Sequence, residues 1–177
     1  MEDILEGCKK GDRKSQQQLY QRYYGKMMGA CLRYAKNEDD AKDVLQEGFI
    51  KVFDKISGYS GTGSLEGWIR RIIVNTAIDA YRKSKRTMMI VDTDFVDSVK
   101  LVDEEEEEDS DELDFTVEDV MREMQNLSPA YRMVFNMYVV ENYTHKEIAE
   151  KLGISEGTSK SNFSKAKKNI RKALLQI

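Results

Sequence analysis

Proline, histidine and cysteine are scarce in this chain of 177 residues, and each shortage excludes a class of structure. One Pro and 11 Gly are too few for the many tight turns of a sandwich or barrel, so the composition favours long helices. The two cysteines, Cys8 and Cys31, exclude a disulfide scaffold and a four-cysteine zinc site. With His145 as the single histidine and no glycine-rich phosphate loop, we expect no catalytic residues, no metal and no cofactor.

Long apolar runs and a secretion signal are also absent. The apolar stretches span only a few residues, whereas a membrane-spanning helix needs about 20. Residues 1–7 lack the basic and then apolar segments of a signal peptide. The sequence therefore predicts a cytoplasmic protein that does not insert into a membrane and has no small-molecule substrate.

Charged residues, by contrast, make up 34% of the chain, above the roughly 25% of ordinary globular proteins. The net charge of −4 conceals an asymmetry, because residues 92–114 contain 13 acidic residues and one basic residue. The remaining 154 residues carry 27 basic and 19 acidic residues. Basic stretches at 65–86 and 155–177 flank the acidic segment, and such stretches indicate a negatively charged partner.

The acidic segment divides the chain into two parts. Because like charges repel and few apolar residues are present to offset the entropy of ordering, residues 91–115 are interpreted as a flexible acidic linker. A solubilising insert without contacts is the simpler alternative. The domains predicted on either side cover 1–90 and 116–177. Both have helical patterns, so the expected fold is all-α, with two small helical domains.

Three long helices are predicted in the first domain from apolar residues at three- and four-residue spacing. A loop with three glycines in six residues, at 58–63, separates the second helix from the third. The second helix has an acidic face opposite its apolar face. Such a face could bind a metal ion, but no histidine lies near it, so contact with solvent or a protein is favoured. The residues of this face are Asp40, Asp43, Gln46 and Glu47.

The glycine loop and the helix after it contain groups that suit single-stranded nucleic acid. Tyr59 and Trp68 offer aromatic rings, and Arg71 and Asn75 offer hydrogen-bond donors, so an unstacked base could be bound there. The alternative for Trp68, and the favoured place for its ring, is the core beside Ile72 on the same helix face.

The second domain begins with a short amphipathic helix at about 117–127. Ser128 followed by Pro129 then marks the start of another helix, because serine caps a helix and proline is tolerated in its first turn. The residues that this helix is expected to turn toward the core are Val134, Phe135, Tyr138 and Val139.

The strongest local signal is a helix-turn-helix between 144 and 171. Thr144 and Glu147 form a capping box, Gly153 suits a left-handed turn, and Ser155 caps the last helix. His145 is expected to be an exposed residue at the helix start. The last helix has a basic outward face that fits a major groove, and a helical hairpin with a solvated basic face is the alternative. Its candidate contacts to bases and phosphates are Gly157, Thr158, Lys160, Ser161, Ser164 and Lys165, followed along the backbone by Lys167, Lys168, Arg171 and Lys172.

Four segments, in order, resemble the motifs of one protein family. They are 37–49 (NEDDAKDVLQEGF), 59–72 (YSG to LEGWIRRI), 127–135 (LSPAYRMVF) and 147–158 (EIAEKLGISEGT). On these segments the chain resembles the extracytoplasmic-function sigma factors, which are small two-domain bacterial members of the sigma-70 family. The resemblance covers both domains in the right order and leaves only the acidic linker unmatched.

The resemblance implies a dissociable subunit of bacterial RNA polymerase, which directs promoter recognition and transcription initiation and is not itself an enzyme. The implied partners are core RNA polymerase and promoter DNA. Because relatives are often held inactive by an anti-sigma protein, such a protein is a further candidate partner.

The same resemblance assigns three surfaces. Core polymerase would dock on the helix with Asp40, Asp43, Gln46 and Glu47. The residues that would bind and melt the minus-ten element are Tyr59, Ser60, Gly61, Trp68, Arg71, Asn75 and Arg82. The residues that would read the minus-thirty-five element are Arg132, Thr158, Lys160, Ser161, Ser164, Lys165 and Lys168.

Four positions depart from the family pattern. Leu65 stands where an aromatic residue is common, and Ser60 where a basic residue is often found. Ser159 stands where the family often has valine, and Asn162 where a longer polar residue is frequent. The promoter sequence therefore cannot be carried over from relatives.

Two other functions remain as alternatives. A free-standing helix-turn-helix regulator would bind DNA without polymerase, but it would need a sensing or dimerising domain in place of the Trp68 loop and the basic helix. A protein-interaction module without DNA binding is opposed by the basic face of the last helix.

Overall fold

The computed structural model describes the backbone of residues 1–91 and 116–176, and the side chains of 1–86 and 116–176. Within these ranges the chain forms helices and turns and no strand, which confirms the all-α prediction. It divides into two compact units, Met1–Ser84 (unit 1) and Lys85–Ile177 (unit 2). The linker predicted at 91–115 lies almost entirely outside the described residues, so the domain boundaries at 90 and 116 stay predictions.

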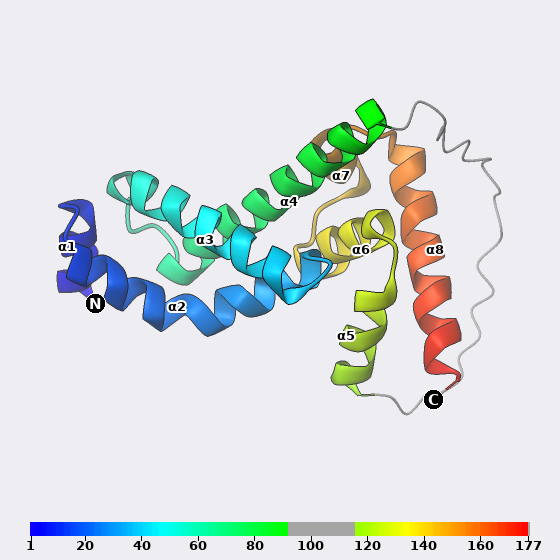
Figure 1. Ribbon diagram of the computed structural model, residues 1–177, viewed down its shortest axis with the longest axis horizontal. Coiled ribbons are helices and arrows are strands. Elements are labelled where there is room, and N and C mark those ends of the chain that lie inside the picture. Colours follow the sequence, from blue (N-terminus) through cyan, green and yellow to red (C-terminus); the bar gives the residue numbers. More distant parts are fainter. Residues whose placement is uncertain (92–115, 177) are drawn as a thin grey trace. The chain divides into compact units, whose positions relative to one another are not determined.

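Unit 1 contains four helices and a short 3-10 turn (Figure 1). They are α1 (Glu2–Lys9), α2 (Arg13–Tyr34), α3 (Glu38–Lys55), η1 (Ile56–Gly58) and α4 (Leu65–Val91), the last of which continues past the unit boundary. Helix α1 packs on α2, and α2 packs on α3. The loop between η1 and α4 is the glycine loop that the sequence indicated.

Polar caps set the starts of these helices. Asp12 accepts a hydrogen bond from the Ser15 N–H at 2.8 Å, and Asn37 accepts one from the Asp40 N–H at 2.8 Å. The first turn of a helix leaves such N–H groups without intrahelical partners, so these contacts stabilise the ends. The apolar faces then meet in one core, whose largest fully buried residues are Leu19, Met27, Leu45, Val52, Ile56, Ile69 and Ile73.

Helices α3 and α4 approach each other closely at Gly48. A Cβ atom at this position would clash with the Cδ1 atom of Ile73 and would lie 3.4 Å from the Ile73 Cα. A side chain at this position would displace the end of the Ile73 side chain, so glycine permits the closest approach of the two helices. The acidic face of α3 and the loop before α4 are therefore held on one packed framework.

Unit 2 contains α5 (Val117–Asn126), α6 (Pro129–Phe135), η2 (Asn136–Val140), α7 (His145–Leu152) and α8 (Glu156–Leu174). Helices α6 and α7 both pack on α8. The turn between α7 and α8 has Gly153 in the left-handed conformation at φ 64°. The capping box at Thr144 and the Ser155 cap are both present, which confirms the helix-turn-helix.

The helix that starts at Pro129 differs from the prediction because its second half, η2, is a π-helix. A π-turn contains an extra residue, so the side chains after it change register relative to an α-helix. Tyr138 and Val139, expected in the core, are 39% and 49% exposed, whereas Met137 is fully buried. The spacing of apolar residues in the sequence assumes a regular α-helix, so it could not reveal this extra residue.

Candidate protein and nucleic-acid interfaces

The acidic face of α3 is exposed to solvent, and one of its carboxylates, Glu47, pairs with Lys51 at 2.7 Å. Asp40, Asp43, Gln46 and Glu47 are all exposed, while Leu45 on the opposite side of the helix is buried. Among the described residues no cluster of His, Cys, Asp or Glu side chains has a metal-binding arrangement. The face can therefore offer carboxylates and an amide to a basic or polar partner surface.

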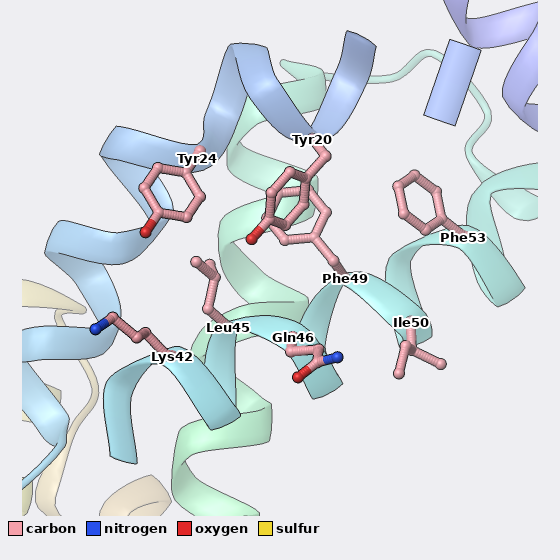
Figure 2. Close-up of a pocket in the computed structure, with 8 residues that line it drawn as sticks. All are labelled: Tyr20, Tyr24, Lys42, Leu45, Gln46, Phe49, Ile50 and Phe53. Carbon is pink, nitrogen blue, oxygen red and sulfur yellow. The ribbon is translucent and has the colours of Figure 1, made fainter. Parts of the chain in front are cut away.

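A groove of about 440 Å³ lies beside this face, between α2 and α3 (Figure 2). Its wall on α2 consists of Tyr20 and Tyr24, and the Tyr20 ring meets Phe49 of α3 edge-on at 4.7 Å. Ile50 is 55% exposed at the groove although it is a large apolar residue. The remaining residues that line the groove are Lys42, Leu45, Gln46 and Phe53.

Sequence reasoning missed this groove. The available signal was Ile50, which lies four residues after Gln46 and three after Glu47 and so falls on the polar side of α3. An exposed apolar side chain within an acidic stripe indicates protein contact better than it indicates a solvated face. Gln46 belongs both to the acidic face and to the groove, so the two form one continuous surface.

The glycine loop is held by its own polar groups. The Tyr59 hydroxyl donates to the Gly63 carbonyl oxygen at 2.8 Å, and the hydroxyl oxygens of Ser60 and Thr62 are 2.7 Å apart. Gly61 has φ 80° and Gly63 has φ 79°, which is the left-handed region that glycine adopts without strain. The loop therefore has a defined shape, while Ser60 and Gly61 stay exposed.

Trp68 joins this loop to the core. Its ring centroid lies 5.5 Å from that of Tyr59, and both rings are half-buried against the apolar cluster of unit 1. The predicted core role of Trp68 is therefore present, and one part of its surface stays accessible. Arg71, Asn75 and Arg82 follow at helical spacing on α4, with both arginines exposed and Asn75 partly buried.

Helix α8 has a polar outward face and a buried inner face. Lys160, Ser164, Lys165 and Lys168 are exposed, and Thr158 and Ser161 are partly buried. The Thr158 N–H donates to the Ser155 Oγ at 3.0 Å, which fixes the helix start. The Nζ of Lys160 lies 3.0 Å from a Glu156 carboxylate oxygen, an exposed ion pair that contributes little to folding and leaves the lysine accessible.

Comparison with known families identifies the two units. Residues 19–87 match the model of sigma-70 region 2, and residues 118–170 match that of sigma-70 region 4. Together the two matches span more than two thirds of the chain, in the order that the sequence motifs indicated. The chain belongs to the extracytoplasmic-function sigma factors. Its function is that of a sigma factor, a DNA-binding protein that acts with RNA polymerase in transcription initiation.

Individual relatives agree with this family. The chain is 27% identical over 154 residues to the ECF RNA polymerase sigma factor SigE of Mycolicibacterium smegmatis, covering 87% of the chain but only 59% of that relative. It is 25% identical to the RNA polymerase sigma-H factor of Pseudomonas aeruginosa, with 98% and 93% coverage. It is 29% identical to the ECF RNA polymerase sigma-E factor of Haemophilus influenzae, with 94% and 91% coverage.

A solved structure has a similar fold. The sigma factor RpoE of Bartonella quintana, crystallised with the anti-sigma factor NepR, aligns with a TM-score of 0.50 at 20% identity. The alignment covers 91% of this chain and 96% of that chain. None of the helices in the described part of this sigma factor has the length and apolar character to cross a membrane.

Arg132, which the resemblance assigns to the minus-thirty-five surface, lies in α6 and is buried in unit 2 of the sigma factor. It is 4% exposed, and its Nη2 donates to the Leu127 carbonyl oxygen at 2.9 Å. Burial lowers the pKa of the guanidinium. The arginine therefore joins α6 to the end of α5, and we leave it out of the proposed DNA-reading surface.

His145 is likewise not the exposed residue that its place at the helix start suggested. Its ring stacks on Tyr138 at a centroid distance of 4.5 Å and an interplanar angle of 17°. Its Nδ1 lies 2.9 Å from the Oγ of Ser159 on α8. Burial, and then the charge of Lys160, lower the pKa of this imidazole below the ordinary value of 6.5.

Proposed function

We propose that this sigma factor uses three separate surfaces to start transcription at a promoter. The α3 face with its groove binds core RNA polymerase, the glycine loop with α4 binds and melts the minus-ten element, and α8 reads the minus-thirty-five element. The observation that carries this proposal is the region 2 and region 4 match combined with exposed residues at each surface. The free-standing regulator is disfavoured because region 2 is present.

The polymerase surface combines charge and apolar contact. Asp43 and Glu47 supply negative charge on the same side of α3 as Gln46, and Ile50 and Tyr24 offer exposed apolar surface at the groove. Such a surface is complementary to a partner helix that has basic residues beside an apolar residue. Apolar contact provides affinity, whereas charge provides orientation and a fast encounter. Asp40 extends the acidic part of the same helix.

Charge reversal tests this surface. The double variant Asp43→Lys with Glu47→Lys is expected to abolish co-elution with core polymerase, because two attractions become repulsions. Both positions are exposed, so the helical circular dichroism should not change. The matched control reverses Glu2 and Asp3, which are exposed on α1 of the same unit. Full binding by the double variant would contradict the docking proposal.

For the minus-ten element, the loop and α4 offer separate contacts. Ser60 and Gly61 are exposed at the loop, and Trp68 presents part of an aromatic ring beside Tyr59. A base turned out of the stack can pack on such rings and bond to nearby backbone groups. The remaining residues predicted for this element, Arg71, Asn75 and Arg82, extend along α4, where the arginine charges suit phosphates.

For the minus-thirty-five element, the residues of α8 divide by position. Lys160 lies near the helix start and Lys165 at its middle, where we place contacts to base edges, and Lys168 lies about one turn farther along, where we place a phosphate contact. Alanine at Lys160 or Lys165 should cost about 1–3 kcal/mol on the selected promoter only. Lys168→Ala should weaken all duplexes alike and reduce the salt dependence by about one unit. The other proposed contacts are Thr158, Ser161 and Ser164.

The wider cellular role follows from these partners. We propose that the chain has no catalytic activity of its own and acts in the cytoplasm, where the polymerase works. An anti-sigma protein is a proposed regulator, supported by the complex with NepR that is recorded for the Bartonella quintana RpoE. Co-purification with core polymerase, with and without such a protein, tests this role directly.

A further inference from the structure

A polar contact links the two helices of the helix-turn-helix beneath the surface that faces DNA. We propose that His145 is a positioning residue for promoter reading: through Ser159 it fixes how α8 presents Thr158 and Lys160 to the base pairs. The inference rests on the proposed reading of the minus-thirty-five element by α8. It adds a residue that does not itself touch DNA.

The contact is built into the fold. Ser159 is 0% exposed, and its Oγ lies 2.9 Å from the Nδ1 of His145. The imidazole is held on its other sides by Tyr138, stacked at 4.5 Å, and by Phe163 of α8, at 5.7 Å. Because Tyr138 also contacts Phe163 at 4.5 Å, the ring of His145 is fixed by residues from both η2 and α8.

The start of α7 is fixed as well. Thr144 caps this helix, and the Glu147 carboxylate accepts from the Thr144 N–H at 2.8 Å, so the backbone at His145 is well determined. A side chain with a fixed backbone and a packed ring can hold a hydrogen-bond partner in one place. Ser159 is therefore tied to a rigid point outside its own helix.

The position of Ser159 makes its hydrogen bond with His145 important for reading DNA. Thr158 and Lys160 are its immediate neighbours, one on each side, at the start of α8. A small rotation of α8 about its axis would move both side chains across the groove. Contacts to base edges depend on such placement far more than contacts to phosphates do. Loss of the His145–Ser159 hydrogen bond should therefore reduce the selectivity for the selected duplex more than the affinity for DNA in general.

Two substitutions of His145 separate the hydrogen bond from the ring packing. His145→Phe keeps a ring to stack on Tyr138 but removes Nδ1. His145→Asn loses the ring but places an amide near the position of Nδ1, so it can still bond to Ser159. The ratio of affinities for a selected duplex and a random duplex is measured for each full-length variant with core polymerase, at about pH 8, where histidine is neutral. The selected duplex is obtained from a randomised pool with the wild-type holoenzyme.

The expected result is a selectivity ratio about tenfold lower for His145→Phe, the size of one hydrogen bond, and a clearly smaller loss for His145→Asn, which keeps the hydrogen bond without the ring packing. Affinity for the random duplex should stay unchanged in both. An unchanged ratio in His145→Phe, or an equal loss in both variants, would overturn the proposal.

The double variant His145→Phe with Ser159→Ala excludes a purely structural role. Replacing both partners by apolar groups removes the unpaired buried hydroxyl, so the unfolding midpoint should recover relative to His145→Phe alone. Selectivity should stay low because the tie is absent. If selectivity recovers together with stability, the pair only satisfies a buried group and the positioning role is wrong. A wild-type holoenzyme that selects no duplex would instead contradict the proposed function of α8.

Discussion

The two units of this sigma factor are built on different kinds of core. The large, fully buried side chains of unit 1 are aliphatic apart from Met27, and Thr76 is the one buried polar residue among its described positions. Unit 2 buries three methionines, Met124, Met133 and Met137, and its buried polar residues are Arg132, Asn136, Ser159 and Asn162.

This difference affects how each unit can carry function. In unit 1 the apolar core holds the helices, so the proposed polymerase contacts Asp43 and Glu47 lie on the outside, whereas Tyr59 and Trp68 at the glycine loop also pack against the core. In unit 2 the polar residues that hold the helices lie next to the residues that would read DNA, as Ser159 lies beside Lys160.

The largest expected effect comes from the core of unit 1. Ile73→Ala should lower its free energy of unfolding by about 2–5 kcal/mol, because a fully buried aliphatic side chain leaves a cavity beside Gly48. Trp68 is the single tryptophan, so its fluorescence during denaturant unfolding reports unit 1 alone. The control is Val117→Ala in unit 2, which is 75% exposed. A decrease in the free energy of unfolding of less than about 1 kcal/mol would contradict the inference that unit 1 depends on apolar packing.

Replacing a buried polar residue by an apolar one tests the core of unit 2. Arg132→Met retains an apolar stem of similar length but removes the donor to the Leu127 carbonyl, so unit 2 should lose about 1–3 kcal/mol. Far-ultraviolet circular dichroism should show the shift while the Trp68 fluorescence transition stays in place. Arg122→Met is the matched control, since Arg122 is exposed and pairs with Asp119 at 2.8 Å on the surface. Equal effects of the two substitutions would contradict a structural role for Arg132.

A smaller effect, dependent on pH, is expected from His145 in unit 2. The folded state lowers the pKa of His145, so as the pH falls below about 6.5 the unfolded chain takes up a proton first. The stability linked to His145 is therefore complete above this pH and is lost as the pH falls toward the folded pKa. Lys160 opposes protonation of the imidazole and Glu156 favours it.

The pH effect is isolated by difference, because many carboxylates also titrate in acid. The unfolding midpoint of wild type should fall more between about pH 7 and pH 5 than that of His145→Asn, which cannot titrate at this position. Parallel pH profiles for the two proteins would show that the histidine is not linked to folding.

The smallest expected effect concerns the glycine loop. Tyr59→Phe removes only the hydroxyl that donates to the Gly63 carbonyl. Because the site is partly exposed, the loop should lose about 0.5–1.5 kcal/mol of stabilisation. Binding of the holoenzyme to a single strand of a duplex that the wild-type holoenzyme selects from a randomised pool should weaken, while the Trp68 unfolding transition barely moves. Ser57→Ala, in an exposed turn before the loop, is the control. An unchanged affinity would mean that the glycines alone shape the loop.

Much of the fold was predictable because its signals are local. Capping residues such as Asn37, Thr144 and Ser155 bond to backbone groups three residues away, and Gly153 marks a turn by its own conformation. Apolar spacing located the long helices for the same reason. The outward residues of α3 and α8 follow once the apolar faces are known.

Only the tertiary structure decided which polar residues are buried and which apolar residues are exposed. The sequence at Arg132 and His145 resembles that of surface positions, yet packing from other helices encloses the first and ties the second to Ser159. The groove beside Ile50 likewise requires Tyr24 from another helix. These features depend on distances between residues far apart in the chain, and periodicity within one helix contains no information about such distances.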